Sequence, residues 1–137
     1  MDDELTGEVT RGGRALIVYP HLRGKTGQDP EMRLEEAKGL ALAIGIIVAD
    51  AFYVPLREPR PATLFGQGQV ERIATACEQC EAELVIVDGA LSAIQQRNLE
   101  EKLKRKVIDR TGLILEIFGE RAATAEGRLQ VELAHLD

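Results

Sequence analysis

Short apolar runs alternate along the chain with segments in which apolar residues recur at helical spacing. Runs that are continuously apolar or rich in β-branched residues predict strands, and four segments have this pattern: 14–19, 46–54, 83–88 and 106–109. Helical periodicity predicts three intervening helices, at about 31–44, 66–80 and 92–104. Because strands and helices alternate, we expect an α/β fold, with a mainly parallel sheet of about four strands joined by crossover helices.

Local signals indicate where these elements begin and end. Pro20 is expected to end the first strand, and Gly45 the first helix. Segment 55–61 contains three prolines and is predicted to be irregular. Ser92 and Gln95 have the spacing of a capping box, in which each side chain bonds the backbone N–H of the other residue.

A further helix is predicted directly after the last strand. Asp109 is expected to cap or brace this helix from Thr111, by accepting free N–H groups for about 1 kcal/mol. Its apolar face would consist of Leu113, Ile114, Ile117 and Phe118. A second helical pattern follows, with a stripe of Leu129, Leu133 and Leu136.

These elements divide the chain into three parts. We expect a flexible tail at 1–13, an α/β domain at 14–122, and the start of a helical arm at 123–137. The last helical pattern runs to the final residue without a Gly or Pro terminator, which favours a piece of a longer protein.

Composition bounds the class of protein. The chain has 137 residues, of which 45% are hydrophobic and 4% aromatic, so we expect one domain with an aliphatic core. No run approaches the roughly 20 apolar residues of a membrane span. The N-terminus is acidic and has no hydrophobic signal segment, so a cytoplasmic protein without a membrane partner is predicted.

The charge is unevenly distributed. A net charge of -6 argues against a free-standing nucleic-acid binder, because phosphate binding depends on Lys and Arg. Segment 97–110 nevertheless contains six basic and three acidic residues, a local charge of +3. Two interpretations remain open for this segment: a basic face that meets RNA, or an ordinary solvated helix of mixed charge.

Gly24-Lys25-Thr26 is similar to the end of a P-loop but lacks its context. A P-loop has a glycine five positions before the Gly of its Gly-Lys pair, and that position is Tyr19, inside the first predicted strand. Gly27 and Pro30 follow where a helix would have to begin. No GTPase site is therefore expected in this chain.

Gly66 and Gly68 precede a predicted helix and are the weak candidates for cofactor binding. Unpaired N–H groups of a first helical turn can bind an anion, but the third glycine of a dinucleotide fingerprint is replaced by Glu71. The alternative is a tight turn in which glycine supplies a backbone with positive φ.

The cysteines and carboxylates predict neither a metal site nor a catalytic one. Cys77 and Cys80 lie at the end of a predicted helix near acidic residues, so we expect core-facing or half-exposed thiols. Zinc needs about four ligands, and only two distant histidines could join these cysteines. Asp50, Asp88 and Asp109 lie at or within strands, where open α/β sheets bind ligands, but no His or Ser partner is recognisable.

The pattern in residues 66–73, 91–100, 106–121 and 127–134 resembles the N-terminal domain of the HflX-type GTPases, a family of ribosome-associated GTP-binding proteins. The resemblance extends over roughly 14–136. The matching positions are Gly66, Gly68, Gln96, Arg97, Asn98, Leu99, Asp109, Arg110, Thr111, Arg121, Gln130, Val131, Glu132 and Leu133. The chain departs from the family's pattern at Gln69, Ala123 and Ala125, where basic residues are common, and at Ala93, where Pro is frequent.

The resemblance implies a non-catalytic domain of about four parallel strands, followed by a helical arm and a separate GTPase domain. The full-length protein would bind the large ribosomal subunit, with GTP and Mg²⁺ as its cofactors, whereas this chain would hold none. Its own GTPase domain and ribosomal RNA would be the partners. The candidate contacts are Arg97, Lys104, Arg110 and Arg121, of which Arg110 is alternatively a structural brace.

A second interpretation is a stand-alone α/β domain that binds a nucleotide or small anion. Gly66, Gly68, Asp88 and Asp109 would then form the rim of the site at the carboxyl ends of the strands. A third possibility is a dimerising module that uses the apolar stripe of the last helix.

Overall fold

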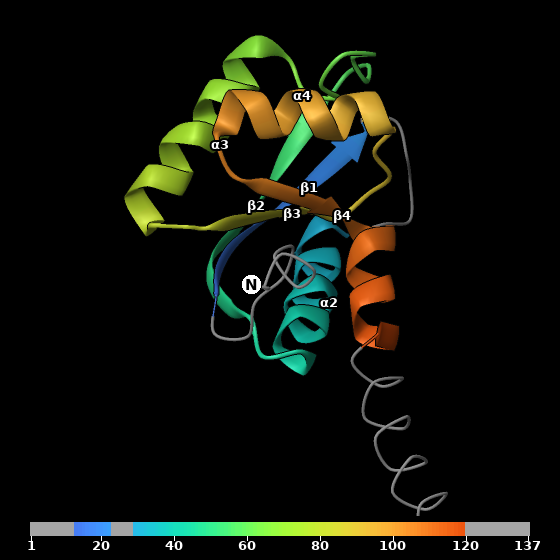
Figure 1. Ribbon diagram of the computed structural model, residues 1–137. Coiled ribbons are helices and arrows are strands. Elements are labelled where there is room, and N and C mark those ends of the chain that lie inside the picture. The colour runs from blue at the N-terminus through green and yellow to red at the C-terminus, as the bar shows by residue number, and fades with distance from the viewer. Residues whose placement is uncertain (1–12, 23–28, 120–137) are drawn as a thin grey trace, which may run out of the picture.

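A computed structural model of the chain describes residues 13–22 and 29–119 (Figure 1). Its elements in chain order are β1 (Arg14–Leu22), α2 (Pro30–Ala43), β2 (Ile47–Leu56), α3 (Gln67–Cys80), β3 (Leu84–Val87), α4 (Ala93–Leu103) and β4 (Lys106–Asp109). A further helix covers 110–119. The predicted α/β fold with four strands and crossover helices is therefore confirmed.

The four strands form one sheet in the order β2-β1-β3-β4, and every neighbouring pair is parallel. The chain turns from β1 to β2 at one side of the sheet and then crosses back to β3 at the other side. The carboxyl ends of β1 and β3 are consequently the point at which the strand order reverses. Open α/β sheets bind ligands at such a point.

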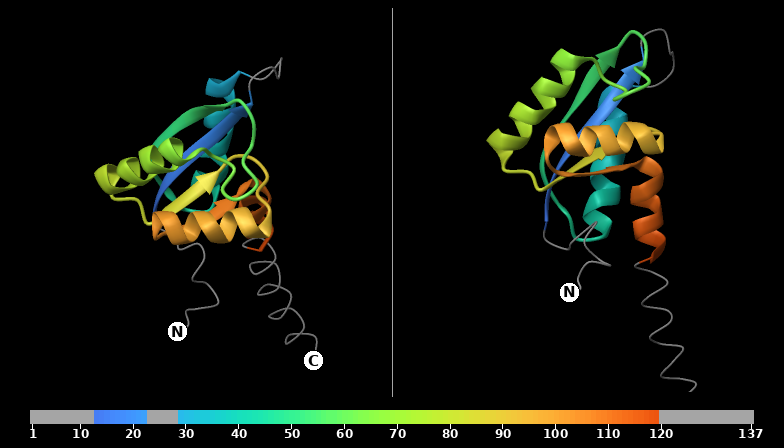
Figure 2. Two further views of the ribbon diagram at one scale, coloured as in Figure 1. Left: turned by 90° about the horizontal axis from the view of Figure 1, so that it is seen from above. Right: turned by 45° about the horizontal axis from the view of Figure 1, so that its top comes forward.

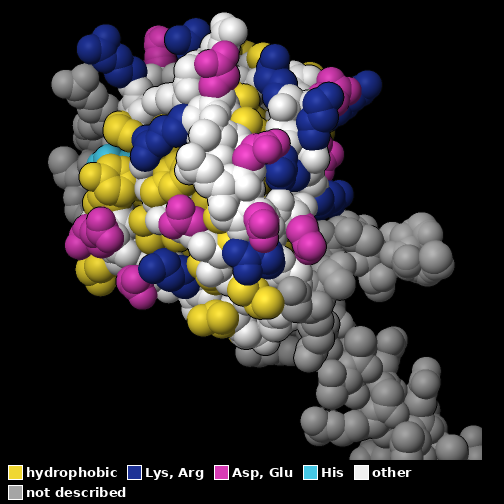
Figure 3. Space-filling view, turned by 90° about the vertical axis from the view of Figure 1, so that its left-hand side faces the viewer, with side chains coloured by type: hydrophobic (Ala, Val, Ile, Leu, Met, Phe, Trp, Pro, Cys, Tyr) yellow, Lys and Arg dark blue, Asp and Glu magenta, His cyan; other side chains and the backbone are white. Residues whose placement is uncertain are grey.

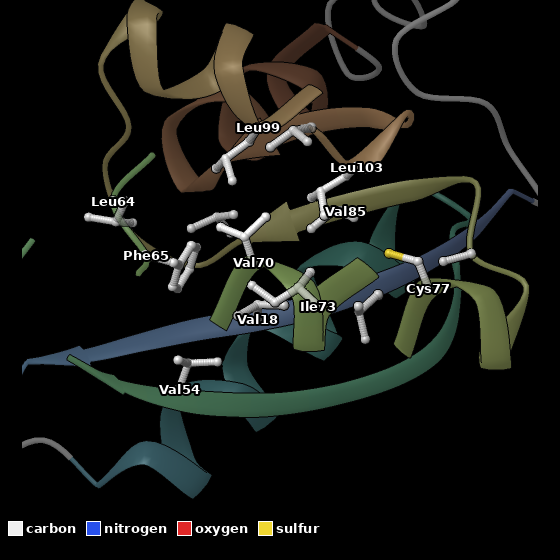
Figure 4. Packing of buried hydrophobic residues seen from close by; sticks show 14 of the residues in the cluster. Val18, Val54, Leu64, Phe65, Val70, Ile73, Cys77, Val85, Leu99 and Leu103 are labelled. Atoms are coloured by element: carbon white, nitrogen blue, oxygen red, sulfur yellow. The ribbon is translucent and has the colours of Figure 1, made fainter. Parts of the chain in front are cut away.

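Helices cover both faces of the sheet, as Figures 1 and 2 show: α3 and α4 lie on one face, and α2 and helix 110–119 on the other. Each face has its own cluster of buried side chains. One cluster joins alternate strand residues such as Val18 and Val85 to α3 and α4 (Figure 4), and the other joins Ile17 and Ile86 to α2. Tyr19 and Phe65 are the two aromatic residues among the described buried core residues, so the described core is mainly aliphatic, as predicted.

Two strands run further than the sequence predicts. β1 continues through Pro20 to Leu22, and β2 continues through Pro55, because the two strands pair in register until their ends. β2 is an edge strand, where a proline removes no bond that a neighbour needs. Asp50 Oδ1 accepts a hydrogen bond from the backbone N–H of Ala51 at 2.8 Å. This N–H in the edge strand is then not available to pair with another strand.

The last described helix also differs from its prediction. Leu113 is buried and Ile117 packs against the core, as expected, but Phe118 is 60% exposed. Leu115 and Phe118 therefore lie on the outer side of this helix. The predicted stripe of Leu129, Leu133 and Leu136, and the boundaries at 13 and 122, fall on or next to residues outside the described ranges.

The predicted helix caps are present. Ser92 Oγ accepts from Gln95 N at 3.1 Å, and Gln95 Oε1 accepts from Ser92 N at 2.9 Å. Asp109 Oδ1 accepts from Gly112 N at 2.8 Å, and its Oδ2 accepts from Leu91 N at 3.1 Å. Asp109 thus ties the start of helix 110–119 to the segment before α4.

The cysteines lie where the sequence predicts. Cys77 is fully buried in the cluster that joins α3 and α4 to the sheet (Figure 4), and Cys80 is half-buried at the end of α3. Burial raises the pKa of the Cys77 thiol from 9.0 to about 11, although nearby Arg105 opposes the shift. Because the folded-state pKa is the higher one, the stability that this neutral thiol contributes is complete below pH 9 and is lost as the pH rises towards 11.

Replacing Asp109 by Ala should lower the free energy of unfolding by about 2 kcal/mol, since two backbone N–H groups lose their acceptor at once. Urea denaturation measures the effect. Asp50→Ala is the control, because it removes a single exposed hydrogen bond in strand β2 and should cost less than about 1 kcal/mol. Equal losses in the two variants would show that Asp109 does not brace two segments.

An aromatic disulfide reagent at pH 8 should label the folded protein at Cys80 and spare Cys77, because Cys77 is buried and neutral at that pH. The Cys80→Ala variant isolates Cys77, whose labelling should then follow the rate of unfolding in urea. Rapid labelling of Cys77 in the native Cys80→Ala variant would contradict the buried position.

Candidate functional site

A hollow of about 510 Å³ opens where β1 and β3 end. Apolar side chains such as Tyr19, Leu22 and Leu56 form much of its wall, and Asp88 and Gly89 lie at the end of β3. Asp88 is 1% exposed, and its backbone N–H donates to Val18 O at 2.8 Å. The buried carboxylate is the main charged feature of this edge of the sheet.

Two arginines from different elements neutralise Asp88. Its Oδ1 accepts from Arg110 Nη1 at 2.7 Å and from Arg33 Nη2 at 3.2 Å. Arg110 Nη2 also lies 3.3 Å from Glu36 Oε1, so two cations and two anions form one balanced cluster. An unpaired carboxylate buried to this extent would cost several kcal/mol, roughly 3–5, which makes the pairing a condition of the fold.

Arg110 is held firmly in this cluster. Burial tends to lower the pKa of its guanidinium, but the hydrogen bond and charge of Asp88, together with Glu36, raise it overall. Its backbone N–H donates to Gly89 O at 3.1 Å. Arg110 therefore acts as a brace between β3, α2 and the start of helix 110–119, which is the structural alternative that the sequence left open.

The residues predicted to form the rim of a nucleotide site are only partly brought together in the structure. Asp88 and Asp109 lie at the ends of neighbouring strands, but Asp109 uses both oxygens on backbone N–H groups. Asp88 Oδ2 and Arg33 Nε have no hydrogen-bond partner among the described residues. The Arg33 guanidinium lies over the ring of Tyr19, 5.3 Å from its centroid, so this cation is directed at the domain's own groups.

Gly66 and Gly68 are at the start of α3. Gly66 is the cap of this helix with φ −69°, so the prediction that glycine supplies a positive φ here is wrong. Its N–H donates to Gln69 Oε1 at 2.9 Å, but glycine has no side chain that could accept from the N–H groups of the first helical turn. A hollow of about 770 Å³ lies beside Gly66, with His21, Arg57 and Arg60 in its wall.

The basic residues of α4 are exposed. Arg97 and Lys104 are separated by two helical turns and lie on the same side of the helix as Glu101. Arg97 Nε is 3.7 Å from Glu101 Oε2, and both side chains are largely exposed. Lys104 ends the helix in the left-handed region with φ 58°. Arg121 and Gly24-Lys25-Thr26 lie outside the described residues.

Sequence reasoning missed the polar side chains that position the segment after β2. Gln95 Nε2 donates to Arg60 O at 2.8 Å, and Asn98 Nδ2 donates to Ala62 O at 2.9 Å. The prolines of this segment indicate an irregular backbone but not what holds it. The polar residues that recur along α4 were the available signal, since half-buried amides need partners.

Figure 3 shows the side of the molecule on which β2 lies, where apolar side chains gather near the histidine and charged side chains of both signs surround them. Across the described ranges, no group of three or more His, Cys, Asp or Glu side chains is arranged to hold a metal ion. None of the helices described here is long and apolar enough to cross a membrane.

Known proteins are similar to this chain in sequence and in fold. The family described as GTP-binding GTPase N-terminal matches residues 31–119. A Magnetococcus marinus protein named GTPase HflX is 48% identical over 124 residues, which are 90% of this chain and 28% of that protein. An Escherichia coli protein of the same name is 40% identical over 126 residues, 91% of this chain and 29% of the relative. The chain thus spans less than a third of the length of these relatives.

Solved structures agree on the fold. A GTP-binding protein from Sulfolobus solfataricus in complex with GDP has a TM-score of 0.56 at 21% identity, over 77% of this chain and 30% of that one. A structure described as a complex of SsGBP and GDP has a TM-score of 0.61 at 23% identity, over 90% of this chain and 34% of that one. With the family match over 31–119, these comparisons show that the chain belongs to the family of GTP-binding GTPase N-terminal domains, the N-terminal domain of the HflX type.

Proposed function

We propose that this domain is the non-catalytic N-terminal part of a longer GTPase, that it helps to bind the large ribosomal subunit, and that it regulates a downstream GTPase domain. The names of the relatives support the GTPase activity of the longer protein, which would bind GTP and Mg²⁺ in its own separate domain. In this chain Arg33 and Arg110 are paired with Asp88, and Arg110 also with Glu36. These charges hold the domain together, which suits a domain that supports the work of another one.

The proposal that this domain helps to bind the ribosome rests on the exposed face of α4. Arg97 and Lys104 extend from a helix that is fixed to the sheet by Leu99 and Leu103. Lys102 adds a third exposed cation. The pair between Arg97 and Glu101 is exposed, and such pairs contribute about 0–1 kcal/mol, so RNA phosphates can replace it at little cost.

The proposal that this domain regulates a downstream GTPase domain is supported by the brace at Arg110. Helix 110–119 begins at Arg110, and its direction is fixed by bonds to Asp88, Glu36 and Gly89. In the longer relatives, whatever follows this helix is connected to the α/β domain through it. We infer that a rigid exit from the sheet lets ribosome contacts on this domain restrain the GTPase domain.

Arg97→Glu combined with Lys104→Glu in the full-length protein should weaken binding to large ribosomal subunits by roughly tenfold or more, because two phosphate contacts become repulsive. Co-sedimentation at several salt concentrations measures this loss. Lys38→Glu on α2 is the control, since it reverses a partly exposed lysine on the opposite face of the sheet. Unchanged co-sedimentation of the double variant would refute α4 as a contact.

A nucleotide or small anion bound to the α/β domain itself is the second candidate function. It is favoured by the hollow beside Gly66, into whose wall Arg57 and Arg60 bring positive charge. Against it, Asp109 has no free oxygen and Asp88 accepts from two arginines, so the predicted carboxylate rim is largely engaged.

Thermal unfolding of this chain with ATP, GTP, their diphosphates and Mg²⁺ separates the two candidates. If the domain is a docking module, the melting temperature should change by less than about 1 °C, because no ligand binds the folded state tightly enough to stabilise it. A rise of several degrees that disappears in Arg60→Gln would favour the nucleotide site beside Gly66.

A further inference from the structure

Arg57 and Arg60 differ from the other described arginines. Six of the eight arginines in the described ranges contact a carboxylate, a carbonyl or a ring: Arg14, Arg33, Arg72, Arg97, Arg105 and Arg110. Arg57 and Arg60 are both exposed, and no described acidic side chain forms an ion pair with either. They are therefore available to a partner.

The segment that carries these arginines is held rigidly. Arg60 and Leu64 exchange two backbone hydrogen bonds, of 2.9 and 2.8 Å. The amides of Gln95 and Asn98 on α4 bind the carbonyls of Arg60 and Ala62. Pro59 and Pro61 fix φ on either side of Arg60. The backbone that carries Arg60 is therefore already ordered, so binding a partner costs little backbone conformational entropy.

The backbone of Leu64 shows that the surrounding structure holds segment 57–66 in its conformation. Its φ is 68°, a left-handed value that is unfavourable for a bulky side chain and costs of order 1–3 kcal/mol. The strain is tolerated because Leu64 is buried and its neighbour Thr63 donates through Oγ1 to Phe65 O at 2.7 Å. Strained residues that the surroundings hold in place are frequent at binding sites.

The two arginines are next to the basic residues of α4. Arg60 lines the hollow beside Gly66 together with Arg57, and it also lines a second hollow of about 740 Å³ between α3 and α4. Lys102 and Lys104 lie in the wall of that second hollow. The two hollows share Arg60, and together they are lined by Arg57, Arg60, Lys102 and Lys104. Glu58, Glu71 and Glu101 line them as well, so the four cations exceed the carboxylates by one charge.

We infer that segment 57–66 is a second part of the RNA-binding surface, in which Arg57 and Arg60 bind backbone phosphates and Gln95 and Asn98 are positioning residues. This inference rests on the proposed docking function. Guanidinium forks suit the paired oxygens of a phosphate. We favour an RNA backbone over an acidic peptide, because the cations are distributed over two hollows that share Arg60 and a polynucleotide carries a phosphate at every nucleotide.

The test uses the full-length protein and purified large ribosomal subunits over a range of salt concentrations. Arg57→Gln combined with Arg60→Gln should weaken binding roughly tenfold and reduce the salt dependence by about two counterions. Asn98→Ala changes no charge, yet it should weaken binding severalfold because it releases the carbonyl of Ala62. Arg72→Gln is the matched control, since its guanidinium lies over Phe52, 4.7 Å from the ring centroid.

The outcomes separate this inference from the docking function. If the Arg57/Arg60 variant binds normally while Arg97→Glu with Lys104→Glu does not, segment 57–66 is no contact and docking through α4 stands. If neither variant weakens binding, docking itself is refuted. A short single-stranded RNA should compete with the subunit for the parent protein. Competition by a polyglutamate peptide but not by RNA would overturn the assignment of an RNA partner. A thermal shift that a nucleotide induces in the parent protein and not in the Arg57/Arg60 variant would show that these arginines bind a free nucleotide.

Discussion

The rest of the structure depends on the burial of one carboxylate. Asp88 follows β3 at the point where the strand order reverses, and at 1% exposure it is stable only because Arg33 and Arg110 bond its Oδ1. These arginines come from α2 and from the start of helix 110–119. A single buried charge therefore fixes three elements relative to one another, because removing either cation would leave part of it uncompensated.

This pairing also decides where binding chemistry can reside. In many open α/β sheets the carboxyl ends of the strands hold the ligand. In this domain the charged groups of that edge are directed at each other: Arg33 to Asp88 and Tyr19, Arg110 to Asp88 and Glu36, and Asp109 to backbone N–H groups. The cations without a described partner lie instead towards α3 and α4. The charged groups at this edge are therefore engaged within the domain, whereas the exposed cations of segment 57–66 and α4 remain open to solvent.

The sequence predicts the order of the elements well because the periods of helices and strands differ, and because the caps at Ser92, Gln95 and Asp109 use residues only a few positions apart. It fails where distant segments decide the outcome. Pro20 and Pro55 read as strand ends, but pairing of β1 with β2 carries both strands past them. Arg33 and Asp88 are 55 positions apart, and only the crossover brings them together. Likewise, the prolines of 55–61 predict an irregular segment, whereas its rigidity comes from α4.

The overall negative charge makes the placement of the few free cations important. A chain with a net charge of -6 has little general attraction for RNA. In the proposed docking, affinity therefore has to come from a small number of cations whose positions are fixed before binding, since each then loses little conformational entropy. Segment 57–66 and α4 meet this condition, because Gln95 and Asn98 hold the arginine-bearing backbone against a helix that is itself anchored in the core. Under this proposal, repulsion elsewhere on the surface opposes other orientations on the RNA, so an acidic domain with a few rigidly held cations can select one docking geometry.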